Sequence, residues 1–108
     1  MSKSQRTKGA AGEREVVGIL NDELGVSASR NLDQSRDGGC DIWLQVAGKP
    51  MALEVKRVEK ASLPAWMDQV AKVEAEYHAV VWRPSRRPWT VALPLEDFIK
   101  LLREVGVE

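Results

Sequence analysis

The sequence contains one cysteine and one histidine among its 108 residues, and the scarcity of each excludes a kind of site. Cys40 has no second cysteine for an internal disulfide, which fits a reducing, intracellular setting. A structural zinc site is excluded, because Cys40 and His78 are too few cysteine and histidine ligands to build one. No apolar run is long enough to span a membrane, and no signal peptide follows Met1. We therefore expect a cytoplasmic protein, nucleoid-associated or phage-encoded, without a membrane partner.

The chain also lacks net charge, since 16 basic side chains balance 16 acidic ones. The total charge therefore gives little support to a nucleic-acid partner, but the distribution of charge is uneven. Basic residues dominate the start of the chain and the segment 83–87, whereas acidic residues collect after position 95. This asymmetry permits a basic face with an acidic back. The alternative is an ordinary solvated surface.

The length fits one domain with a single hydrophobic core. Residues 1–8 are polar and lack apolar periodicity, so we expect a flexible basic arm followed by a single folded domain over 9–108. Apolar periodicity and turn signals predict three helices and five strands. The predicted helices cover about 9–24, about 62–73 with Ser62 as the N-cap, and the last residues from about 95. The predicted strands cover 27–32, two segments within 40–58, 78–82 and 89–93. The order α-β-β-β-α-β-β-α predicts an α/β fold, with helices covering a mixed five-stranded sheet.

The most informative pattern is an acid that opens one apolar segment and an acid-x-lysine that closes the next. Asp41 precedes Ile42-Trp43-Leu44, and Glu54-Val55-Lys56 ends the following segment. Carboxylates in such segments are costly to bury unless they are paired or bind a metal ion. Because side chains alternate along a strand, Glu54 and Lys56 share one face.

A four-residue turn over residues 47–50 would set the register of this hairpin. Val46 would lie opposite Met51, Trp43 opposite Glu54, and Asp41 opposite Lys56. The two acids and the lysine would then converge on one face. A slip of one residue would instead put the acids and the lysine on opposite faces.

Two carboxylates and a lysine in one place suit a divalent cation and a phosphodiester, which points to a nuclease. We expect Asp41, Glu54 and the backbone carbonyl of Val55 to bind Mg²⁺, with Mn²⁺ as a substitute. Lys56 would orient or help to deprotonate the attacking water and balance charge on phosphorus. The alternative is an ordinary cross-strand ion pair between Asp41 and Lys56.

These residues resemble a known family. Asp41 and Glu54-x-Lys56 resemble the core of PD-(D/E)xK nucleases, and the segment 8–17 resembles the helix-one signature of archaeal-type Holliday junction resolvases. The resemblance spans about residues 8–93, although Cys40 stands where the family usually has proline. It implies a restriction-endonuclease-like fold and a metal-dependent endonuclease that resolves four-way junctions in DNA recombination and repair. It also implies a homodimer.

The resemblance gives further residues a role. Glu13 would be a ligand of a second metal ion or would support the first metal site; otherwise it is a solvent-facing helix carboxylate. Arg30 would contact DNA phosphates, or it would pair with Asp33 or Asp37. Gln69 would reach a metal-bound water or a phosphate, or it is a surface glutamine. The residues expected to contact DNA are Lys8, Arg14, Arg30, Ser35, Arg36 and Gln69.

Two other functions compete with the resolvase. One is a general nicking or restriction-type endonuclease of the same fold, and the other is a non-catalytic DNA-binding module. Trp82 and Trp89 would supply a dimer interface or fill the core. We expect Cys40 to be a small buried residue rather than a nucleophile and His78 to be structural.

Overall fold

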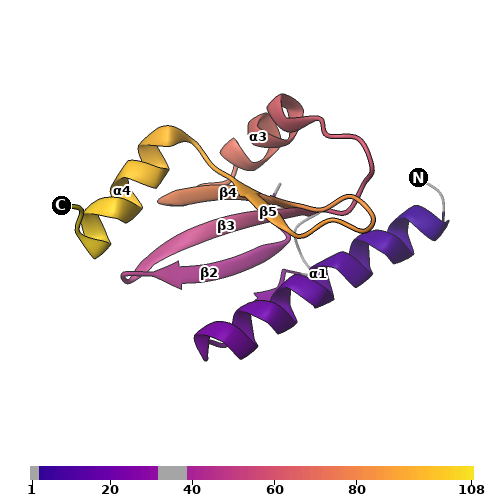
Figure 1. The fold of residues 1–108 in the computed structure, drawn as a ribbon, viewed down its shortest axis with the longest axis horizontal. Helices are drawn as coiled ribbons and strands as arrows, with labels where there is room; N and C mark the ends of the chain where they lie inside the picture. The colour runs from indigo at the N-terminus through magenta and orange to yellow at the C-terminus, as the bar shows by residue number, and fades with distance from the viewer. Residues whose placement is uncertain (1–2, 32–38) are drawn as a thin grey trace.

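The computed structural model describes residues 3–31 and 39–108, with side chains described from Gly9 onward. A five-stranded sheet in the order β1-β2-β3-β4-β5 lies at its centre (Figure 1). The elements are α1 (Lys3–Leu24), β1 (Ser29–Arg30), β2 (Ile42–Val46), β3 (Lys49–Lys56), α3 (Leu63–Ala71), β4 (Tyr77–Trp82), β5 (Thr90–Ala92) and α4 (Leu95–Val105). β3 and β4 are parallel, and the other neighbouring strands are antiparallel. The predicted element order and mixed sheet are therefore confirmed.

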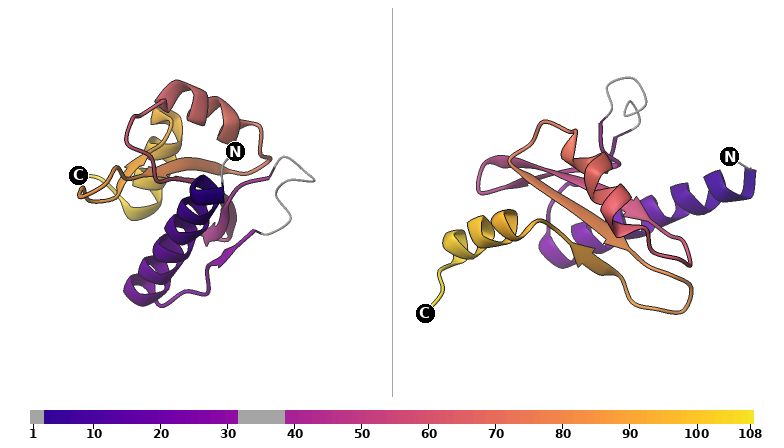
Figure 2. Two further views of the ribbon diagram at one scale, coloured as in Figure 1. Left: turned by 90° about the vertical axis from the view of Figure 1, so that its right-hand side faces the viewer. Right: turned by 90° about the horizontal axis from the view of Figure 1, so that it is seen from above.

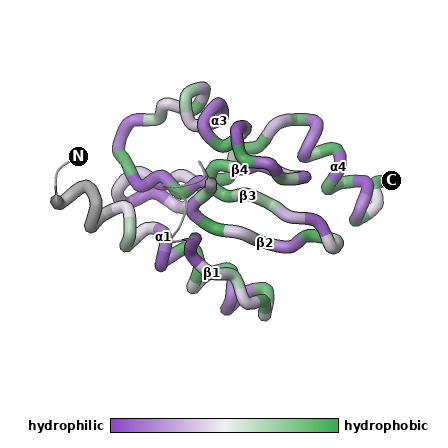
Figure 3. The backbone as a smooth tube through the Cα atoms, turned by 180° about the vertical axis from the view of Figure 1, so that it is seen from behind, coloured by the Kyte–Doolittle hydropathy of each residue, from purple (hydrophilic) through white to green (hydrophobic). Residues whose placement is uncertain are grey.

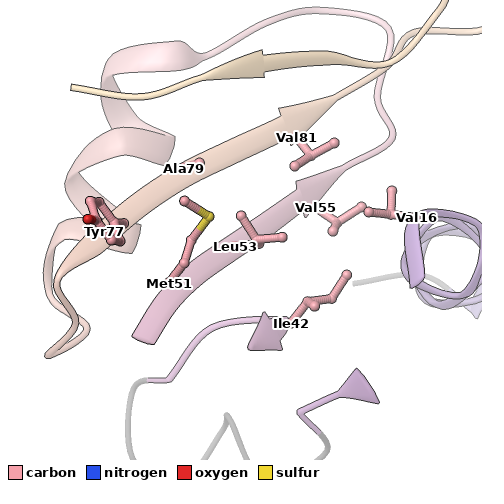
Figure 4. Close-up of a cluster of buried hydrophobic side chains, with 8 residues drawn as sticks. All are labelled: Val16, Ile42, Met51, Leu53, Val55, Tyr77, Ala79 and Val81. Carbon is pink, nitrogen blue, oxygen red and sulfur yellow. The ribbon is translucent and has the colours of Figure 1, made fainter. Parts of the chain in front are cut away.

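Helices cover both faces of the sheet (Figure 2). On one face, Val16 of α1 packs against a cluster that includes Leu53 and Val81 of the central strands (Figure 4). On the other face, Trp66 and Val70 of α3 pack with a second cluster. The alternation of side chains along β3 supplies both clusters, since odd and even positions point to opposite faces. None of the helices in the described ranges is long and apolar enough to cross a membrane.

The hairpin of β2 and β3 differs from the predicted one. Val46 pairs with Lys49, so the turn has two residues, and the predicted four-residue turn over 47–50 is wrong. Both turn residues have positive φ, 52° at Ala47 and 76° at Gly48, as the tight turns favoured in hairpins require. Trp43 consequently pairs with Ala52 rather than with Glu54.

The register is thus shifted by two residues from the predicted one. Ile42 pairs with Leu53, and the next step along this register brings Asp41 beside Glu54 instead of Lys56. Because the shift is an even number of residues, every side chain keeps its predicted face. Asp41, Glu54 and Lys56 therefore still lie on one face of the hairpin, as predicted.

The start of one helix also differs from the predicted start, and the predicted cap of another helix lacks its hydrogen bond. Helix α1 begins at Lys3, so the backbone of residues 3–8 continues the helix, and the predicted helix start near residue 9 is wrong. Ser62 precedes α3 as predicted, but its side chain makes no capping hydrogen bond. Pro64 occupies the first turn of that helix, where its missing N–H costs no hydrogen bond.

Candidate active site

Two buried carboxylates lie together at the end of β3. Glu54 is 2% exposed and Asp41 is 7% exposed. The backbone of Asp41 extends the hairpin, since its N–H donates to the carbonyl of Leu53 at 3.0 Å. The side chain of Asp41 accepts a hydrogen bond from the N–H of Val55 at 2.8 Å. The main chain of β3 thus fixes the orientation of the Asp41 carboxylate beside Glu54.

The pair cannot easily hold two negative charges. Burial raises the pKa of Glu54 to about 8, and the negative charge of Asp41 adds to the rise, while Lys56 opposes it. Without a cation, burial and the neighbouring Asp41 thus favour the protonated form of Glu54. A bound divalent cation would stabilise both carboxylates in their ionised form, so the donor set fits such an ion.

Lys56 is oriented from two sides. Its Nζ lies 3.7 Å from Oε2 of Glu54, and it donates a hydrogen bond of 3.1 Å to Oε1 of Gln69. Gln69 is an exposed residue of α3, the helix that covers this face of the sheet. Its observed contact is with the lysine, so α3 contributes a group that holds Lys56 close to the carboxylates.

Glu13 approaches the same site from α1. Arg30 Nε donates to Oε1 of Glu13 at 3.0 Å, and 12% of the Glu13 side chain is exposed, so the solvent-facing alternative is wrong. Burial raises the pKa of Glu13, the hydrogen bond from Arg30 opposes the rise, and the charge of Asp41 adds to it. Glu13 and Asp41 are thus close enough to influence each other. Glu13 is the observed partner of Arg30, and the predicted alternatives Asp33 and Asp37 lie outside the described residues.

Other predicted site residues are less well placed or are not described. Arg14 is exposed and able to reach a ligand in solution. Ser35, Arg36 and the side chain of Lys8 lie outside the described residues. Within the described part of the chain, no three side chains of His, Cys, Asp or Glu are close enough to form a metal-binding group. Glu13 therefore lies near the pair of Asp41 and Glu54 but does not complete a three-residue group with it.

A cluster on the other flank of α1 was not predicted from the sequence. Trp89 Nε1 donates to Oε1 of Glu15 at 2.9 Å, and Nη1 of Arg83 lies 3.2 Å from the same oxygen. The guanidinium carbon of Arg83 lies 5.4 Å from the centroid of the Trp89 ring. The only sequence signal for this cluster was the spacing of Glu13 and Glu15, because two acids two residues apart lie on opposite flanks of a helix.

The other aromatic and polar residues that the sequence singled out make contacts within the chain. Trp82 Nε1 donates to the carbonyl of Val58 at 3.0 Å, and its ring centroid lies 5.9 Å from that of Trp66. His78 Nε2 lies 2.7 Å from the carbonyl oxygen of Val73. Cys40 is fully buried, and burial raises the pKa of its thiol to about 11, which opposes a role as nucleophile. The expected burial of Cys40 is confirmed, and Trp82 and His78 make hydrogen bonds within the chain.

The chain resembles known proteins in its structure rather than in its sequence. No protein-family model matches the sequence, and no curated protein matches it. The structure of Hjc, a Holliday junction resolvase from the archaeal hyperthermophile Archaeoglobus fulgidus, matches with a TM-score of 0.60 and 20% identity, over 82% of this chain and 74% of Hjc. The structure of SSO0001 matches with a TM-score of 0.52 and 15% identity, over 89% of this chain and 57% of that protein. The chain therefore has the fold of an archaeal Holliday junction resolvase, which the residues of its first helix and hairpin had predicted.

Proposed function

We propose that this protein is a metal-dependent endonuclease that resolves four-way DNA junctions by hydrolysing phosphodiesters. The observation that carries the proposal is the buried pair of Asp41 and Glu54 with Lys56 beside it. A protein has little physical reason to bury two adjacent carboxylates unless they bind a cation or do chemistry. The fold shared with a junction resolvase favours this chemistry over an ordinary ion pair.

Asp41, Glu54 and the carbonyl of Val55 would hold Mg²⁺ or Mn²⁺, because hard cations prefer oxygen ligands. The bound ion would supply an activated water and neutralise charge on the phosphate. Lys56, held by Gln69 at 3.1 Å, would keep its ammonium group beside the reacting phosphate and stabilise the added negative charge. The Arg30 guanidinium, held by Glu13, would supply a second positive charge.

The DNA would approach the end of the molecule where β3 and β4 finish. These strands are parallel, and Lys56 pairs with Trp82, so the loops that follow them begin at the same edge. Those loops carry Arg57, Lys60, Arg83, Arg86 and Arg87, of which Lys60, Arg86 and Arg87 are exposed. The first half of α1, with Lys8 and Arg14, lies at this end too (Figure 1). Such a basic end would bind the phosphate backbone without reading base sequence.

The proposed assembly is a C2 homodimer, because resolution of a junction needs cuts in two opposed strands and each chain offers one site. Trp82 and Trp89 are engaged within the chain and are poor candidates for the interface. The exposed apolar side chains of α4 and the adjoining strand are better candidates, with Leu95 71% exposed. Hydrophobic and hydrophilic stretches alternate along α4 (Figure 3). The exposed apolar residues of α4 and β5 are Val91, Leu95, Phe98, Ile99 and Val105.

Cleavage of a synthetic four-way junction tests the proposal, with linear duplex of the same sequence as the comparison. We expect paired cuts in Mg²⁺ or Mn²⁺, binding without cutting in Ca²⁺, and no cutting in excess chelator. Equal cutting of junction and duplex would favour the nicking or restriction-type endonuclease. Junction binding without cutting in any metal would favour the non-catalytic module, and undiminished cutting in chelator would exclude the metal site.

A further inference from the structure

The cluster of Glu15, Trp89 and Arg83 lies outside the proposed metal site but on the same helix as Glu13. Its three side chains come from α1, from the residue after β4 and from the residue before β5. One oxygen, Oε1 of Glu15, accepts from Trp89 at 2.9 Å and lies 3.2 Å from Arg83. The cluster therefore ties α1 to the loop between β4 and β5.

The position of these contacts around the helix is informative. Gly12 and Val16 are buried against the sheet, and successive helical residues are about 100° apart. Glu13 and Glu15 consequently project on opposite flanks of the buried stripe, each roughly 80° from its centre. Glu13 is held by Arg30 on one flank, and Glu15 is held by Trp89 on the other. Two opposed contacts therefore set the rotation of α1 about its own axis.

The helix also lies close to the sheet at this point. A Cβ atom on Gly12 would lie 3.3 Å from Cβ of Arg57 and 3.5 Å from Cη2 of Trp89. The Trp89 ring thus contacts the helix immediately before Glu13 and hydrogen-bonds immediately after Arg14. A change in this ring or its hydrogen bond would move the backbone that carries Glu13.

We propose that Glu15 and Trp89 are positioning residues that hold α1 in the rotation at which Glu13 and Arg30 face the carboxylate pair. The inference rests on the proposed nuclease function, because it concerns the geometry of that site. It adds residues that touch neither the proposed metal ion nor the scissile phosphate. Glu15 and Trp89 act through the placement of Glu13, so their effect on cleavage depends on Glu13 being present.

The test compares Glu15→Ala and Trp89→Phe with Glu23→Ala, a control that removes an exposed acid from the same helix. Trp89→Phe removes the N–H donor and, because a phenyl ring is smaller than an indole, also the approach of Cη2 to Gly12. We expect the first two variants to slow single-turnover cleavage about tenfold or more, since small misplacements of catalytic groups are costly. Junction affinity in Ca²⁺ should stay unchanged. Glu15→Gln, whose amide oxygen still accepts from Trp89, should recover most of the rate.

A double-mutant cycle separates positioning from a general structural role. In a Glu13→Gln background, adding Glu15→Ala should slow cleavage no further. An equal slowing in both backgrounds, an unchanged rate in Glu15→Ala and Trp89→Phe, or a parallel loss of junction affinity would overturn the inference. If Glu15→Ala does not fold, Trp89→Phe takes its place in the cycle.

A second measurement distinguishes failure of this inference from failure of the proposed function. If the wild-type chain cuts no DNA, the function fails, and binding of Mn²⁺ to the DNA-free protein decides the inference by electron paramagnetic resonance. Weaker Mn²⁺ binding in Glu15→Ala than in Glu23→Ala supports positioning of the site. Equal binding in these two variants overturns it.

Discussion

At the scale of single residues, Glu54 links the stability of the protein to pH. The ordinary pKa of this group is 4.5, and its pKa in the folded protein is about 8. Between these values the folded protein holds a proton that the unfolded chain has released. The free energy of unfolding of the metal-free protein should therefore fall as pH rises through this range and level off above it. Thermal denaturation in chelator at several pH values measures the effect.

Two further measurements test whether the pH dependence of stability comes from Glu54. Glu54→Gln should flatten it, because the amide carries no charge at any of these pH values. Mg²⁺ should restore stability most strongly near the upper end of the range, where the carboxylate is ionised and able to bind. A melting temperature that climbs over this pH range in chelator would contradict the proposed origin of the pKa shift.

Lys56 and Gln69 should differ in the size of their effects on cleavage. Lys56→Ala should slow cleavage by about 100-fold or more, because it removes the charge proposed to stabilise the transition state. Gln69→Ala should cost less, since Glu54 still holds the lysine from the other side at 3.7 Å. Single-turnover rates at saturating junction measure both. Gln45→Ala, an exposed glutamine of β2 distant from the lysine in the hairpin, is the matched control.

At the scale of elements, the turn between β2 and β3 offers a test of the revised register. Ala47 has φ of 52°, a left-handed conformation that costs alanine roughly 1 kcal/mol. Asparagine adopts this conformation more readily, and Asn-Gly is a preferred two-residue hairpin turn. Ala47→Asn should therefore stabilise the fold by about 0.5–1 kcal/mol. Ala47→Val, with a β-branched side chain at positive φ, should destabilise it in the same denaturation experiment.

The same turn shows what could be predicted from the sequence. The faces of Asp41 and Glu54 followed from the alternation of side chains, which depends only on the parity of the register. The register itself depends on which residues form the turn, and Lys49-Pro50 has the composition of a turn although it starts a strand. Pro50 is tolerated there because it lies one residue from the strand end, where a missing N–H is cheap.

Contacts between distant segments were beyond prediction from one sequence. Helix periodicity identified α1 but gave no reason to pair Glu15 with Trp89, 74 residues later. Arg30 had nearby acids in the sequence, and its observed partner comes from the preceding helix. The boundary at Lys3 was missed because the first turns of α1 have no apolar stripe to signal a helix.

At the scale of the whole molecule, the apolar face of α4 predicts the assembly. Phe98→Glu should convert the proposed dimer to a monomer, because a buried charge in the interface would have no partner. Light scattering reports the mass, and paired cutting of the junction should give way to single nicks. Ile19→Glu, which places the same charge on an exposed apolar position of α1, should remain a dimer. A wild-type monomer would exclude this assembly.

The short turn between β2 and β3 also has a consequence for the folding rate. Hairpins joined by tight turns form within about 1–10 µs, well before parallel strands such as β3 and β4 find each other. The two carboxylates belong to this one hairpin, so they are forced together early, before the helices that bury them have docked on the sheet. Their repulsion would then act on the folding transition state itself. Neutralising Glu54 should speed refolding at alkaline pH, rather than only slow unfolding.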